Sequence, residues 1–85
     1  MNKRKQLLAK IETESEVQNI ASIPPYTVVE LIYIEAVTEK TFRGVGLTKK
    51  TLRDVWNTEL GISIARGRAA KDIARQMNRW FRNRV

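Results

Sequence analysis

The chain has 85 residues, a net charge of +7, and neither cysteine nor histidine. This length predicts a single domain, 1–85. The missing residue types exclude disulfides, thiolate or imidazole metal sites, and the commonest general base of enzymes. No apolar run approaches the roughly 18–20 residues of a membrane span, and Lys10 and Glu12 interrupt the segment that a signal peptide would need. We therefore expect a cytoplasmic protein with no membrane contact.

The N-terminal segment, 1–22, is predicted to be helical because it is rich in Lys, Gln, Leu, Ala and Glu, which favour helices. Its apolar residues do not keep one helical phase. Ser15 and Gln18 have the spacing of a capping box, which indicates a break near residues 13–15. The helix must end before Pro24-Pro25, since a proline ring clashes inside a helix.

Residues 26–48 predict a β-hairpin. The first strand, 26–37, is dense in β-branched and aromatic residues, and both of its faces are largely apolar. A turn is expected at 38–41 and a return strand at 42–48. Gly44 and Gly46 match no phosphate-loop motif, so we expect them to allow close packing of strand and helix.

Residues 51–83 predict a long basic helix that begins at Thr51, with Asp54 as the capping-box acid. Its apolar residues fall on two sides that are rotated relative to each other, which predicts a bend or break near Gly67. The expected helix side of the core comprises Trp56, Leu60, Ile64, Ile73, Met77 and Phe81. The predicted fold is a small single-domain α+β protein of order α-β-β-α, with the hairpin packed on the C-terminal helix.

Two apolar faces on the 26–37 strand also bear on assembly. Helices can cover one face of a two-stranded ribbon, and such a ribbon is not stable alone. The second face needs either the N-terminal segment or a second copy of the chain as its cover. We expect a homodimer.

The C-terminal helix has a stripe of cations, here called the basic ridge: Arg68, Lys71, Arg75, Arg79 and Arg82. At about 100° per residue they fall within an arc of roughly 80°, along about 20 Å of helix. Only Asp72 among residues 66–85 is acidic. This pattern is typical of phosphate binding, although an ordinary solvated helix face is the alternative.

Other residues are candidates for the same contact. Lys49, Lys50 and Arg53 precede or open the last helix, whose N-terminal amides favour anions. Trp80 lies between ridge arginines and could stack on bases, whereas Phe81 is expected to pack in the core. Packing in the core or at an interface is the simpler interpretation of both aromatics.

Nothing in the sequence indicates catalysis. Glu30 and Glu35 lie on opposite faces of the predicted strand, so they cannot hold a metal or a glycosidic bond together. No serine lies in a nucleophile-elbow context. We expect no catalytic residue, no metal and no cofactor.

Two stretches, FRGVGLTK at 42–49 and ELGISIARGRA at 59–69, resemble short uncharacterised proteins of phages and prophages of Gram-positive bacteria. The resemblance implies a ββα unit and a mobile-element origin, and no biochemical activity comes with it. The lysines before an alanine-rich helix are also similar to the end of a double-stranded-RNA-binding domain. That fold has three strands, and the sequence predicts two.

The leading hypothesis is a small, basic, non-enzymatic protein that contacts nucleic-acid phosphates through its C-terminal helix. The main alternative is a phage-encoded inhibitor that binds an acidic surface of a host protein in the host cytoplasm. A structural or membrane-surface module is a third. Arginines suit a nucleic acid and an acidic protein equally, so composition does not separate the first two.

Overall fold

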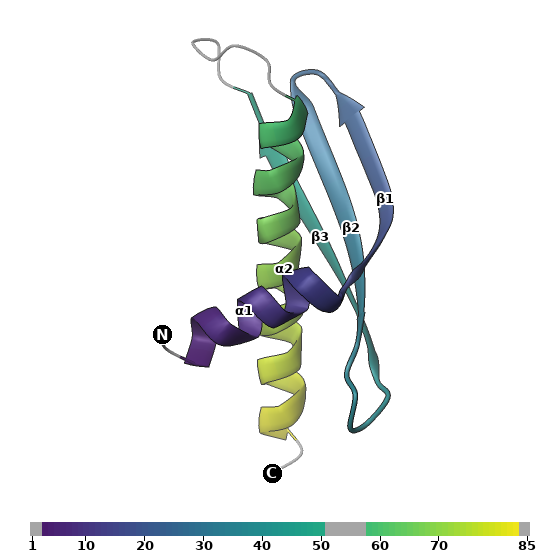
Figure 1. The fold of residues 1–85 in the computed structure, drawn as a ribbon, viewed down its shortest axis with the longest axis vertical. Helices are drawn as coiled ribbons and strands as arrows, with labels where there is room; N and C mark the ends of the chain where they lie inside the picture. Colours follow the sequence, from purple (N-terminus) through teal and green to yellow (C-terminus); the bar gives the residue numbers. More distant parts are fainter. Residues whose placement is uncertain (1–2, 51–57, 84–85) are drawn as a thin grey trace.

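The computed structural model describes residues 3–50 and 58–83, which form two helices and a three-stranded antiparallel sheet (Figure 1). The elements are α1 (Lys3–Glu14), β1 (Glu16–Ile23), β2 (Tyr26–Ile34), β3 (Thr41–Lys49) and α2 (Thr58–Asn83). The strand order is β1-β2-β3, and α2 packs across one face of the sheet. The α+β class and the packing of the hairpin on the C-terminal helix are confirmed.

The first strand of the sheet was predicted as helix. The N-terminal helix ends at Glu14, and Glu16–Ile23 then pairs with β2 as β1. The helix end itself lies where Ser15 indicated a break: the Ser15 N–H and hydroxyl both donate to the Ile11 carbonyl. Beyond it, pairing with β2 overrides the helix propensity of glutamate, glutamine and alanine. The corrected order is α-β-β-β-α.

The prolines connect β1 to β2 as a two-residue turn. Ile23 pairs with Tyr26 on either side of it, and the Pro24-Pro25 bond is cis. The two prolines therefore mark a hairpin turn between strands and not merely the end of a helix.

The β2–β3 hairpin agrees with the sequence except at its loop. β2 ends at Ile34, so Val37 is an exposed loop residue and not the end of a strand. The Glu35 carboxylate accepts hydrogen bonds from the N–H and hydroxyl of Thr38, at 2.7 and 2.6 Å, and from the Val37 N–H. These bonds, those from Thr38 first, hold the pKa of Glu35 below its usual value.

Glycine and alanine allow β3 and α2 to approach closely. A Cβ on Gly44 would lie 2.3 Å from the Ala69 carbonyl oxygen, and one on Gly46 would lie 1.8 Å from that of Ala65. Backbone therefore lies directly on backbone, and the expected close packing of strand and helix is confirmed.

The C-terminal helix is continuous from Thr58 to Asn83, without the bend expected near Gly67. Its two apolar sides instead reflect two partners. Ala65 and Ala69 face the sheet, whereas Ala74 lies against α1. The buried residues of α2 are Ala65, Ala69, Ala70, Ile73, Ala74 and Met77.

Part of the predicted core was wrong for this reason. Ile73 and Met77 are buried as expected, but Leu60, Ile64 and Phe81 are 57, 40 and 41% exposed. Leu60 and Ile64 share the helical phase of the exposed Lys71 and Arg75, which neither the sheet nor α1 covers. Phe81 shares the phase of the buried Ala74 and Met77 but lies in the last turn of α2. Trp56, with the predicted helix start at Thr51 and Asp54, lies outside the described residues.

The N-terminal helix, α1, lies on the same side of the sheet as α2 and crosses α2 (Figure 1). Ile11 is fully buried in the common core, with Leu7 and Leu8 packed against it. Arg66 of α2 donates to the Glu12 carbonyl at 2.7 Å, which places a cation at the C-terminal end of α1.

The opposite face of the sheet is therefore left open. On it lie Tyr26, Val45 and Leu47, which are 43, 52 and 49% exposed, together with Ile23 and Ile34 at 71 and 61%. The N-terminal segment, one of the two covers considered from sequence, is on the other side. We refer to this open surface as the outer sheet face.

Candidate nucleic-acid interface

The basic ridge exists as a continuous surface. All five of its cations are exposed on α2, whereas Ala65 and Ala69 of the same helix are buried toward the sheet. The helix is regular through this stretch, so the arc predicted from 100° per residue is retained. The ridge therefore lies on the solvent-exposed side of α2, and its Arg68 end borders the β3 edge of the sheet.

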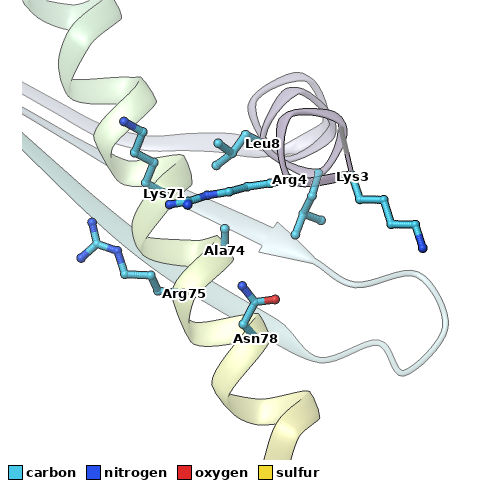
Figure 2. Close-up of a pocket in the computed structure, with 8 residues that line it drawn as sticks. Lys3, Arg4, Leu8, Lys71, Ala74, Arg75 and Asn78 are labelled. Carbon is cyan, nitrogen blue, oxygen red and sulfur yellow. The ribbon is translucent and has the colours of Figure 1, made fainter. Parts of the chain in front are cut away.

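The N-terminal helix adds two cations that the sequence did not assign to the site. Lys3 and Arg4 lie beside Lys71 and Arg75 around a hollow of about 430 Å³ between α1 and α2. We call this the interhelical cleft; Leu7, Leu8, Ala74 and Asn78 complete its lining. Figure 2 shows the Arg4 side chain extending from α1 toward α2, while Lys3 extends away from it.

A second hollow continues the surface along α2. It has a volume of about 250 Å³ and is lined by Arg75, Asn78, Arg79 and Arg82. Arg75 and Asn78 line both hollows. The cations from Lys3 to Arg82 therefore border one surface that spans both helices.

The charges on this surface are not balanced locally. Neither hollow has a carboxylate among its lining residues. Within residues 3–50 and 58–83, no hydrogen bond or ion pair engages the side chains of Lys3, Arg4, Lys71 or Arg75. Like charges gathered without counter-charges raise the local positive potential, which favours the arrival of an anion.

One member of the basic ridge has a structural role. The Arg68 guanidinium donates to the Leu47 carbonyl at 2.6 Å, on the free edge of β3. One and two turns further along α2, Asp72 accepts from the Val45 N–H at 3.0 Å and Gln76 donates to the Arg43 carbonyl. Asp72, the only acidic residue among 66–85, therefore bonds the edge of the sheet and does not neutralise the ridge.

The other predicted cations lie elsewhere. Gly46 packs against Ala65, so the end of β3 lies beside the beginning of α2, far along the helix from Arg79 and Arg82. Lys49 is exposed on the outer sheet face, with its ammonium 5.5 Å from the Tyr26 ring centroid. Lys50 bonds the Pro25 carbonyl through its N–H. Arg53 lies outside the described residues.

Trp80 is a packing residue. Its ring lies edge-on to Phe42 at 6.1 Å and to Phe81 at 4.7 Å, and it is partly buried against the core. The Lys40 ammonium lies 5.7 Å from its centroid. Packing, the simpler interpretation from sequence, therefore holds for Trp80, whereas Phe81 is 41% exposed and is not part of the buried core.

Sequence reasoning missed Lys3 and Arg4 because their role depends on how α1 crosses α2. A signal was present in the cluster Lys3, Arg4 and Lys5. Such a cluster at the beginning of a helix opposes its macrodipole and therefore calls for a compensating partner.

Comparisons with known proteins give no further assignment: no family model, no curated protein and no solved structure matches the chain. Across the described ranges, no group of three or more Asp or Glu residues could hold a metal ion. In the same ranges, no helix is long and apolar enough to cross a membrane.

Proposed function

We propose that the protein is a non-enzymatic binding module that contacts nucleic-acid phosphates. The observation that supports this most directly is the interhelical cleft, which is lined by Lys3 and Arg4 of one helix and by Lys71 and Arg75 of another, with no carboxylate in the lining and with Arg4 directed toward α2. A stripe of cations on one helix can be an ordinary solvated helix face. Cations that line one cleft from two different helices are less easily explained in that way.

The arrangement favours backbone contact over the reading of bases. Lysine and arginine on an exposed helix can neutralise successive phosphates without discriminating between sequences. Trp80, the aromatic residue that could have stacked on a base, packs on Phe42. Binding is therefore expected to depend on salt and to vary little with sequence.

The third strand bears on the kind of nucleic acid. The lysines and the alanine-rich helix are similar to the end of a double-stranded-RNA-binding domain, a fold with three strands. The sequence predicted only two strands, and β1 is the third. Duplex RNA is therefore compared with duplex DNA and single strands in the test. A nucleic-acid partner agrees with the expected cytoplasmic location.

We also propose that the chain forms a homodimer. The outer sheet face is apolar and uncovered, and α1, the segment that could have covered it, lies on the other side of the sheet. A second copy remains as the expected cover for apolar surface of this kind.

The test measures the affinity of fluorescently labelled duplex RNA, duplex DNA and single strands at about 50 mM salt and above. On duplex DNA the log–log salt slope is about −0.9 per phosphate contact. The double variant Lys71→Ala/Arg75→Ala is expected to bind all probes more weakly and to flatten the slope by about 1.8. The matched control, Arg43→Ala/Lys49→Ala, removes the same charge from exposed positions of β3 and is expected to retain the parent slope.

Two results contradict the proposal. One is no detectable binding of any probe at about 50 mM salt, where non-specific association of so basic a chain is measurable. An acidic surface of a protein then becomes the partner to seek. The other is an equal loss in both double variants, because net charge alone and not the cleft would then account for binding.

A further inference from the structure

The two edges of the sheet differ in how their outward backbone groups are satisfied. On β3, the side chains of Arg68, Asp72 and Gln76 each bond one outward backbone group, at alternate residues: the Leu47 carbonyl, the Val45 N–H and the Arg43 carbonyl. These three residues are four apart, so they lie along one line of α2. The β3 edge is therefore closed to pairing with another strand.

The register shows which groups of β1 point outward. The Val45 N–H and the Leu47 C=O point away from β2 and bond side chains of α2. Because backbone groups alternate in direction along a strand, the N–H and C=O of Gly46, which lies between them, point toward β2. Gly46 pairs with Val29, and Val29 pairs with Ile20 of β1. By the alternation of an antiparallel ladder, the N–H and C=O of Ile20, and likewise of Ser22, point away from β2. In the part of the chain that the structure describes, no hydrogen bond reaches them.

β1 is also exposed beyond its edge. The helix α2 packs on β3 and β2, and the extensive contacts of β1 are with β2 alone. Val17 and Ile20 are 41 and 44% exposed on the face toward the helices, and Ile23 is 71% exposed on the outer sheet face. The strand contains no lysine or proline, which commonly protect edges, and its single bulge lies at Val17/Asn19.

We propose that β1 pairs antiparallel with β1 of a second copy, about a twofold axis normal to the sheet, to form one six-stranded sheet. A strand edge is complementary to its own twofold copy, because donors and acceptors alternate along it. The inference keeps the two-chain stoichiometry of the homodimer proposed above but moves its interface from the outer sheet face to the β1 edge, and it does not depend on nucleic-acid binding. It assigns the interface to a strand edge and leaves the outer sheet face outside it.

A second copy fits this edge better than an unrelated strand. Because α2 closes both outer β3 edges, pairing stops at two chains and gives a closed dimer. The single charge of β1 is Glu16 at its beginning, and antiparallel pairing places the two Glu16 residues at opposite ends. The two α2 helices lie about four strand spacings apart, roughly 20 Å. That separation exceeds the Debye length of about 8–10 Å, so repulsion between the basic ridges is screened.

The experiment is sedimentation equilibrium at tens of micromolar protein in about 0.3 M salt. The parent is expected to be a dimer. Ser22→Pro removes an outward N–H without removing a bond to β2, and is expected to be a monomer. Ser22→Ala keeps the N–H and is the matched control, expected to dimerise as the parent does. Circular dichroism and a thermal melt establish that each variant is folded.

Ile20→Lys provides a second variant in case the proline prevents folding. It places a charge on an exposed side chain beside the same edge and is also expected to be a monomer. Leu47→Lys, on the outer sheet face, is expected to remain a dimer. A monomeric parent overturns this inference and the proposed homodimer together. The edge interface alone is overturned if the Ser22→Pro and Ile20→Lys variants both remain dimers while Leu47→Lys becomes a monomer. It is also overturned if all three variants remain dimers.

Discussion

At the scale of single residues, the role of a glycine here depends on what a Cβ in its place would meet. At Gly46 a Cβ would lie 1.8 Å from the Ala65 carbonyl oxygen and 2.5 Å from the Ala69 nitrogen, both in the backbone of α2. At Gly67 the nearest atom would be the Glu12 Oε1, at 3.4 Å, which belongs to a flexible side chain. The first glycine is required by packing and the second is not.

We therefore predict opposite effects for the same substitution. Gly46→Ala must separate β3 from α2 and is expected to lower the free energy of unfolding by about 1–3 kcal/mol or more, as other overpacked sites do. Gly67→Ala is expected to raise it by up to about 1 kcal/mol, because alanine favours a helix interior. Chemical denaturation of the two variants checks both signs. A destabilising Gly67→Ala would contradict the regular helix through this position.

The cations show what a sequence can and cannot assign at this scale. Helical spacing placed Lys71 and Arg75 correctly on one exposed arc. It could not show that Arg68 bonds a strand edge, or that Arg4 joins the cleft from the other helix. Those two facts depend on contacts between elements that are far apart in the chain.

At the scale of elements, the hairpin and the long helix could be predicted because their patterns are local. β2 alternates between buried and partly exposed residues, and its β-branched composition indicates a strand without further information. β1 could not be identified in the same way, because its residues 16–23 are mostly exposed and include good helix formers. Only the hydrogen bonds of β2 make it a strand.

The helix α2 shows a second limit of sequence analysis. Two apolar phases on one helix have two physical explanations, a bend or a second partner. The structure has the second: the sheet packs on Ala65 and Ala69, and α1 packs near Ala74. The bend was inferred because the position of α1 across α2 is not encoded in the periodicity of α2.

Stability measurements distinguish these two arrangements of α2. Ile73 is fully buried, so Ile73→Ala is expected to lower the free energy of unfolding by about 2–5 kcal/mol, which is much of the stability of a domain this small. Leu60 is 57% exposed, so Leu60→Ala is expected to cost well under about 1 kcal/mol. Urea denaturation of both variants provides the comparison. Equal losses would restore Leu60 to the core and contradict the continuous helix phase.

At the scale of the whole molecule, the two proposals together define a geometry. A twofold axis normal to the sheet does not turn the sheet over, so pairing through β1 keeps both α2 helices on the same face. The two basic ridges then lie on the same face of the sheet, roughly 20 Å apart. A dimer of this kind presents two phosphate-binding surfaces to one side, whereas a face-to-face dimer would point them in opposite directions.

This geometry predicts that affinity depends on the length of the duplex. A duplex long enough to contact both ridges engages the second one at high effective concentration, whereas a very short duplex engages one. The parent is therefore expected to bind long duplexes more tightly than monomeric Ser22→Pro does, and with about twice the salt slope, since twice as many phosphates are neutralised. On the shortest duplexes the two proteins are expected to bind alike, because each ridge is intact in both. Anisotropy titrations across a series of lengths and salt concentrations measure this difference, with Ser22→Ala as the dimeric control. If a dimeric parent and a folded monomeric variant bind every length equally, the two ridges do not act on one duplex.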